Sequence, residues 1–207
     1  MNWFINLNPI WQASLAGVFT WACTAAGASL VYFFNTINKK LLAIMNGFAA
    51  GVMIAASFWS LLAPAISYAE ANGYGRLAFL PAALGFMGGG IFLRLLDKVI
   101  PHLHLDQSRS QAEGMPSKLP STTLLFLAIT IHNIPEGLAV GVAFGAAGLG
   151  IEEASLSAAL ALALGIGLQN FPEGAALSMP IRAHGASQSR ALIWDNYLPW
   201  LKFSALF

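Results

Sequence analysis

Residues 132–137 read His-Asn-Ile-Pro-Glu-Gly and lie in the middle of a long apolar run that extends from residue 124 to residue 149. Residues 169–174 read Gln-Asn-Phe-Pro-Glu-Gly and repeat the pattern inside a second apolar run. Ionisable residues at the centre of a membrane-length segment mark a functional site by default. We therefore treat the rest of the chain as a scaffold around these two stretches, which are called here the HNIPEG and QNFPEG motifs.

The composition indicates a polytopic membrane protein. Of 207 residues, 57% are hydrophobic and 9% are charged, against about 25% charged in a soluble domain. The mean hydropathy is +0.66. A net charge of +1 gives no reason to expect a nucleic-acid partner, and the single Cys23 excludes a disulfide framework or a thiolate metal site. No Lys or Arg precedes the first apolar segment, so we expect this segment to remain as a span rather than to act as a signal peptide.

Five apolar segments are each long enough for the roughly 20 residues that a bilayer requires. They run approximately over 9–34, 41–68, 77–96, 121–148 and 154–180. The longest polar loop, about 97–120, follows the third segment. We therefore expect an all-α transmembrane helix bundle over residues 1–190. Residues 191–207 are too short and too interrupted for a full span, and we interpret them as a partial sixth span or an aberrant tail.

The cations predict the orientation of these spans. The odd-numbered loops and their flanks hold Lys39, Lys40, Arg94, Lys98, Arg109, Lys118, Arg182 and Arg190, whereas the even-numbered loops hold only Arg76. By the positive-inside rule, the odd-numbered loops are cytoplasmic and the N-terminus is outside. We expect a multi-pass protein of the cell membrane, inner or plasma, with the loop at 97–120 in the cytoplasm.

Both motifs place polar groups on one face of a helix. His132 and Glu136 are four residues apart and share a face, as do Gln169 and Glu173 in the second motif. The proline in each motif lacks an amide hydrogen, so a backbone carbonyl one turn earlier loses its helical partner. Consecutive spans run antiparallel, so the two motifs can meet near mid-membrane. Broken helices with polar groups at the midplane are typical of transporters.

The energetic cost of these residues points to a visiting cation. A charged residue at the centre of a bilayer costs roughly 2.5–3.5 kcal/mol, so two ionised glutamates would cost about 5–7 kcal/mol. Neither motif contains a Lys or Arg to offset them, which leaves protonation, water or a transient ion. Two carboxylates, one imidazole and three amides suit zinc and neighbouring divalent metals, with the metal as substrate rather than as a resident cofactor.

Three further sites have a structural interpretation beside the functional one. His132 could be a hydrogen-bonded packing residue. Met53, in the second span, could add a thioether to a soft metal site. The alternative, which the apolar composition of the span favours, is that Met53 packs in the core. The loop residues His102 and His104, with Asp106, could collect metal on the cytoplasmic side, although a solvated loop is the alternative.

The two motifs resemble the fourth-span and fifth-span motifs of the ZIP family of divalent metal transporters, the second in the form of its bacterial GufA-like branch. The resemblance covers about residues 10–190 and implies an eight-helix fold with a binuclear metal site between spans four and five. It implies that zinc, and often iron, manganese or cadmium, is carried into the cytoplasm. The residues that it assigns to one metal position are His132, Glu136, Gln169 and Glu173, and those that it assigns to the other are Asn133, Asn170 and the two bridging glutamates. Met53 matches a family methionine on the second span.

The sequence departs from the family pattern after the fifth span. The family's sixth span carries a further glutamate in a Ser-Gly-x-x-Glu-Pro context, which is absent here, so we expect spans six to eight to be missing. Zinc transport is the leading hypothesis, and the protein is not expected to be an enzyme. The alternatives are a metal-binding fragment without transport and an intramembrane metal-dependent hydrolase. The expected partners are a divalent metal ion and the lipid bilayer, with a homodimer left open.

Overall fold

The computed structural model describes residues 2–34, 39–103, 109–119, 121–183, 187–189 and 191–192. Regular structure in these ranges is helical, apart from an isolated antiparallel bridge between His102 and Glu113. The predicted all-α helix bundle is therefore confirmed. His104, Asp106 and residues 193–207 of the predicted tail lie outside the described residues.

Each predicted span is occupied by helix. The elements are, in order, α1 (Asn2–Ile5), α2 (Pro9–Ala28), η1 (Ser29–Tyr32), α3 (Lys39–Ser57), η2 (Phe58–Leu62), α4 (Ala63–Ala71), η3 (Gly75–Leu77), α5 (Phe79–Val99), η4 (Arg109–Gln111), α6 (Ser121–Gly148) and α7 (Leu156–Ala183). Three segments, 9–32, 43–71 and 75–99, are long and apolar enough to cross a membrane. Helices α6 and α7 have 28 residues each, which is sufficient by length, and their crossing stays a prediction.

Prolines shape these helices without ending them. In the second span, Pro64 cannot donate to the carbonyl of Ser60, and the five residues of η2 form a π-helix in which the amide of Ala63 reaches back to Phe58 O. Helices α6 and α7 continue without interruption through Pro135 and Pro172. The expectation of broken helices at the two motifs is therefore wrong. A proline removes a single helical hydrogen bond, and neighbouring helices in a membrane can compensate for that loss.

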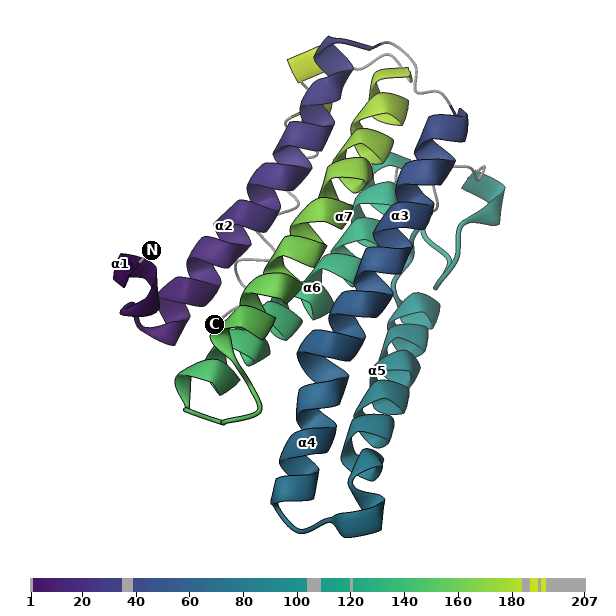
Figure 1. Cartoon of the computed structure of the whole chain (residues 1–207). Helices are drawn as coiled ribbons and strands as arrows, with labels where there is room; N and C mark the ends of the chain where they lie inside the picture. The colour runs from purple at the N-terminus through teal and green to yellow at the C-terminus, as the bar shows by residue number, and fades with distance from the viewer. Residues whose placement is uncertain are drawn as a thin grey trace.

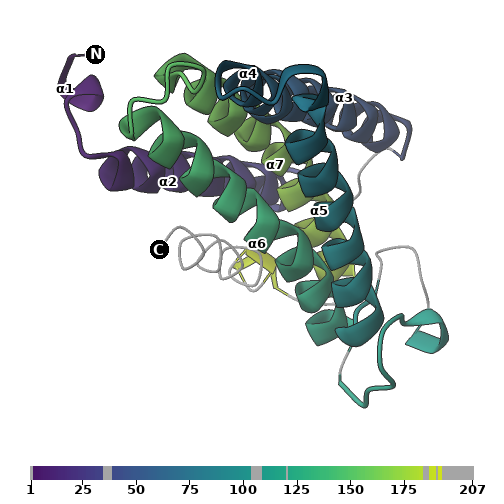
Figure 2. The ribbon, with the colours of Figure 1, turned by 90° about the horizontal axis from the view of Figure 1, so that it is seen from below.

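The core of the bundle is formed by α2, α6 and α7 (Figures 1 and 2). Small and medium apolar side chains from these three helices form one buried cluster: Ala13, Ala16, Val140, Ala143, Phe144, Ala159, Leu162, Ala163 and Ile166. Helix α3 packs against another side of α7, and α5 packs against α4 and α6 at the edge of the bundle. The two motifs are thus carried by helices that belong to the best-packed part of the molecule.

Helices α2 and α7 approach each other so closely that their backbones touch. A Cβ atom added to Gly27 would overlap the carbonyl oxygen of Phe171, and one added to Gly174 would overlap the carbonyl oxygen of Thr24. Two glycines on facing helices therefore set the separation, as small residues do in membrane helix pairs. Gly174 is the last residue of the QNFPEG motif, so this contact fixes the depth of that motif in the bundle.

Small residues at helix-packing spacing predict close helix approach at four glycine pairs: Gly47 with Gly51, Gly85 with Gly89, Gly137 with Gly141 and Gly141 with Gly145. For the first two pairs the prediction is wrong, because a Cβ atom on Gly47, Gly51, Gly85 or Gly89 would meet no atom of the described residues within 4 Å. Spacing alone cannot show which face of a helix is covered. These glycines lie on the outer faces of α3 and α5, away from the contacts that hold the bundle together.

The alanine substitution Gly174→Ala should lower the stability of the purified protein. The added methyl group must displace the backbone of α2, and overpacking of this kind costs about 1–3 kcal/mol. Gly89→Ala is a matched control in open space, and it should be neutral or stabilising by up to about 1 kcal/mol because alanine is the better helix former. Thermal unfolding in detergent, followed by far-ultraviolet circular dichroism, measures both. Equal effects of the two substitutions would contradict the close α2–α7 contact.

Candidate metal-binding site

The HNIPEG motif lies on α6 and the QNFPEG motif on α7, and a hydrogen bond joins them. The side-chain amide nitrogen of Gln169 donates to Oε1 of Glu136. This contact spans 33 positions of sequence and comes from two helices of the buried core. A carboxylate of one motif therefore meets an amide of the other, deep within the bundle.

The polar groups of the two motifs are mostly withdrawn from the surface. Asn170 is fully buried, and Asn133 and Gln169 are exposed by only 4% and 7%. The carboxylate atom Oε2 of Glu136 is also buried, whereas the side chains of Glu136 and Glu173 as a whole are half-buried. The site thus combines buried amides with carboxylates that stay partly accessible, which suits the binding and release of a cation.

Asn170 connects this pair to a third helix. Its amide nitrogen donates to the backbone carbonyl of Thr20 on α2 at 3.0 Å, and its Oδ1 accepts from the amide nitrogen of Gln169 at 3.4 Å. Hydrogen bonds therefore run from Glu136 through Gln169 and Asn170 to Thr20, and they link α6, α7 and α2. This chain orients the Gln169 amide so that its nitrogen, rather than its oxygen, faces Glu136.

Sequence reasoning missed the residues of α2 that support the site. Thr20 and Thr24 are buried, and each hydroxyl donates to a backbone carbonyl of its own helix: Thr20 to Gly17 at 3.0 Å and Thr24 to Thr20 at 3.3 Å. With Gly27 they recur at helical spacing along one face of the first span. That stripe of small and polar residues in an otherwise apolar segment was a signal that could have identified the face docked against α7.

The remaining predicted ligands occupy different surroundings. The side chain of His132 is exposed on the surface of the described chain. Met53 is partly buried against the apolar core cluster. In the described ranges, only Asp97, His102 and Glu113 form a trio of His, Cys, Asp or Glu residues whose ligand atoms all lie within 4.8 Å of one another. The structure thus joins Glu136 to Gln169 but does not gather His132 and both glutamates that tightly, and the metal-binding roles of the predicted residues stay predictions.

Comparisons with known proteins identify relatives over most of the chain. No family model matches the sequence. The chain is 38% identical to zinc transporter ZIP11 of Xenopus tropicalis, in an alignment that covers 92% of this chain and 76% of the relative. It is 39% identical to zinc transporter ZIP11 of Bos taurus, over 68% of this chain and 63% of the relative. It is 36% identical to zinc transporter GufA of Myxococcus xanthus, over 86% and 66%. The chain therefore spans about two thirds to three quarters of the length of these relatives.

A double-mutant cycle on Glu136 and Gln169 should reveal strong coupling in the absence of metal. Glu136→Ala or Gln169→Ala alone removes one hydrogen-bond partner of the remaining polar group, at a cost of about 1–3 kcal/mol each. The double variant removes both groups, so we expect it to lose less stability than the sum, by about 0.5–3 kcal/mol. Unfolding in detergent with a chelator present gives the four stabilities. Additivity within about 0.5 kcal/mol would contradict the contact.

Proposed function

The chain belongs to the ZIP family, and we propose on this basis that it transports divalent metal ions, zinc in particular, across a membrane into the cytoplasm. The relatives are named transporters, which confirms the prediction of a transport protein rather than an enzyme, with the metal as substrate. Iron, manganese and cadmium are further substrates that we propose. The hydrolase alternative gains no support from these names.

The contact between Glu136 and Gln169 is the observation that best supports a metal path between α6 and α7. Two residues that we propose as ligands already touch across the helix interface. We propose one metal position formed by His132, Glu136, Gln169 and Glu173. The adjacent position would be formed by Asn133 and Asn170 with the two glutamates bridging, and Met53 is a further candidate ligand from α3.

The hydrogen bonds suggest how the negative charge of the Glu136 carboxylate is offset when no ion is bound. Without an ion, the Gln169 amide hydrogen faces the Glu136 carboxylate and offsets part of its negative charge. An arriving cation would take the place of that hydrogen, and Gln169 would turn its oxygen toward the ion. Amide oxygens are weaker ligands than carboxylates or imidazole, so the ion would be held moderately. Moderate binding favours release, which alternating access between the two sides of the membrane requires.

The described cations support the proposed orientation. Lys40 lies at the start of α3, Arg94 and Lys98 lie near the end of α5, and Arg182 lies at the end of α7. Because α5 and α7 run in the direction opposite to the continuous segment of α3 and α4 (Figure 1), these residues gather on one side of the bundle, and Arg76 lies at the turn on the other. We propose that the cationic side is cytoplasmic. The ion would leave toward the loop that carries His102 and His104.

Single cysteines should report this orientation in intact cells that express the chain with Cys23 replaced by serine. Both test positions have exposed side chains: Ser110 in the loop after α5, and Glu152 between α6 and α7. Glu152→Cys should react with a membrane-impermeant maleimide, whereas Ser110→Cys should react only after lysis. The reverse pattern would place the N-terminus inside.

Replacing both glutamates, Glu136→Ala with Glu173→Ala, should abolish zinc uptake into vesicles that contain the purified chain. The variant removes both carboxylates that we propose as bridging ligands, so uptake should fall to the level of protein-free vesicles. The matched control is Glu152→Ala with Glu153→Ala, which removes two carboxylates from the loop between α6 and α7 and should leave uptake unchanged. A zinc-sensitive dye trapped inside the vesicles measures the flux.

Unchanged uptake in the Glu136/Glu173 variant would refute the proposed path. Calorimetry that shows zinc binding by the unmodified chain, together with no flux in the same preparation, would instead favour the alternative of a metal-binding fragment without transport. A homodimer in the lipid bilayer stays a prediction, and the mass of the detergent-solubilised protein tests it.

A further inference from the structure

An open groove of about 330 Å³ follows one face of α5 and includes no residue of the two motifs. Its described lining residues all belong to α5 and recur at helical spacing: Met87, Gly90, Ile91, Arg94, Leu95 and Lys98. In the most apolar stretch of the segment that contains α5, none of the residues is buried, so the described chain leaves this face open. The groove is therefore accessible to a molecule of the surrounding membrane.

Gly90 forms the floor of the groove. A Cβ atom there would meet no atom of the described residues within 4 Å, so the depression is the space that a larger side chain would fill. The apolar side chains of Met87 and Ile91 beside it are exposed by 62% and 60%. From Met87 to Lys98 the groove extends about 16 Å along the helix, and half of the hydrocarbon core of a bilayer is about 15 Å thick. The groove thus has the length of an acyl chain in one leaflet.

Two cations lie at one end of the groove, and its described lining contains no carboxylate. Arg94 and Lys98 are four positions apart and so share a helix face, and Lys98 lies in the last turn of α5. Both side chains are exposed. Near the end of a span, long cationic side chains reach the level of the lipid phosphates, and basic residues at that level attract anionic lipids. The polar end of the groove therefore complements a phosphate in both charge and position.

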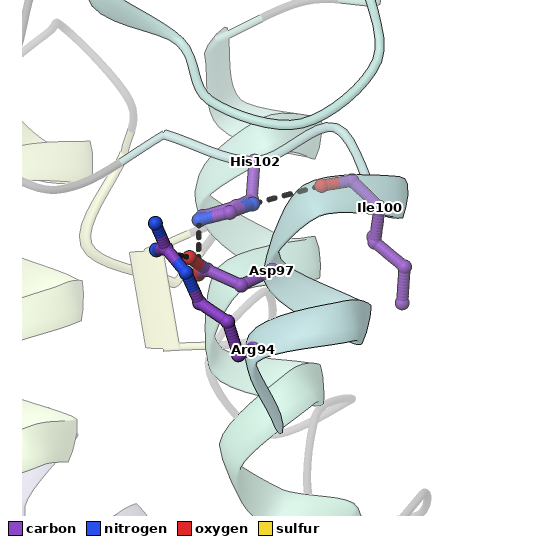
Figure 3. Close-up of polar contacts among 4 residues, drawn as sticks. All are labelled: Arg94, Asp97, Ile100 and His102. Carbon is purple, nitrogen blue, oxygen red and sulfur yellow. Dashed lines mark hydrogen bonds and ion pairs between the residues drawn. The ribbon is translucent and has the colours of Figure 1, made fainter. Parts of the chain in front are cut away.

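The guanidinium of Arg94 is positioned by a series of contacts from the loop after α5 (Figure 3). Its Nη1 donates to Oδ2 of Asp97 at 3.2 Å. Oδ1 of Asp97 lies 3.1 Å from Nε2 of His102. The His102 ring is only 1% exposed, and its Nδ1 lies 2.8 Å from the carbonyl oxygen of Ile100. Among the described residues, Asp97 engages a single nitrogen of the guanidinium, so further N–H groups remain for a phosphate, which arginine can bind through two parallel hydrogen bonds.

We propose that this groove binds one anionic phospholipid. The phosphate would lie between Arg94 and Lys98, and one acyl chain would lie along Met87, Gly90 and Ile91. A second copy of the chain, related by a twofold axis normal to the membrane, would instead bring the same cations together at one depth, and like charges repel. The lipid site does not depend on the transport that we propose through α6 and α7.

Native mass spectrometry of the full chain in detergent tests the charge of the site, with phosphatidylglycerol and phosphatidylcholine of identical acyl chains as probes. We expect one phosphatidylglycerol to bind about tenfold more tightly than phosphatidylcholine. Arg94→Gln with Lys98→Gln should reduce this preference to less than about twofold. The matched control, Lys40→Gln with Arg76→Gln, removes two cations outside the groove and should leave the preference unchanged.

A second pair of variants tests the shape of the groove. Gly90→Leu fills the floor but keeps both cations, and it should abolish the tight binding of phosphatidylglycerol. Gly85 is a matched control because it lies about 140° around the helix from Gly90, and a Cβ atom there also meets no described atom within 4 Å. Gly85→Leu should therefore leave lipid binding unchanged. Far-ultraviolet circular dichroism checks that both variants keep the helical fold.

Three results would overturn the proposal. One is equal binding of the two lipids to the unmodified chain. Another is a retained preference for phosphatidylglycerol in the Arg94/Lys98 variant, or an equal loss of preference in its control. The third is unchanged lipid binding by the Gly90→Leu variant. Zinc flux judges the transport proposal separately, so the failure of one proposal leaves the other standing.

Discussion

The direct contact between the backbones of α2 and α7 sets the position of the polar groups in this protein. Helices in lipid gain no hydrophobic free energy by associating, so close packing and hydrogen bonds must hold them together. Gly27 and Gly174 remove the side chains that would keep the two helices apart. The carbonyl of Thr20 then comes within reach of Asn170. The same contact therefore packs the bundle and places the QNFPEG motif.

Buried polar groups in this bundle are tolerated because they bond to one another. Glu136, Gln169 and Asn170 form a continuous chain of hydrogen bonds that ends on the backbone of α2. An unpaired buried polar group costs about 1–3 kcal/mol, so these hydrogen bonds lower the cost of burying the polar side chains of the two motifs. They also pair the carboxylate with amides rather than with fixed positive charges, which is compatible with the cation binding proposed above.

The two halves of the bundle differ in how much surface they bury. The core cluster lies on α2, α6 and α7. In the most apolar stretch of the segment that contains α5, none of the residues is buried, and in that of the segment that contains α3 and α4 only 17% are buried. Exposed apolar faces of this length would be unfavourable in water but are suited to lipid acyl chains. The open glycines of α3 and α5 belong to these outer faces. The hydrogen-bonded polar side chains of the two motifs are accordingly in the half formed by α2, α6 and α7.

The sequence by itself predicted the helices and suggested candidate residues for the metal site. Apolar length predicted the bounds of α6, and the repeated Asn-x-Pro-Glu-Gly pattern drew attention to Glu136 and Glu173, because both signals are local. Only the tertiary structure decided which faces meet. Gly27 faces the backbone of α7 and Gly174 faces that of α2, whereas Gly47 and Gly51 face no described residue, and His102 lies beside Asp97 and Glu113. Those pairings depend on the rotation and depth of helices distant in sequence, and spacing along a single helix does not encode them.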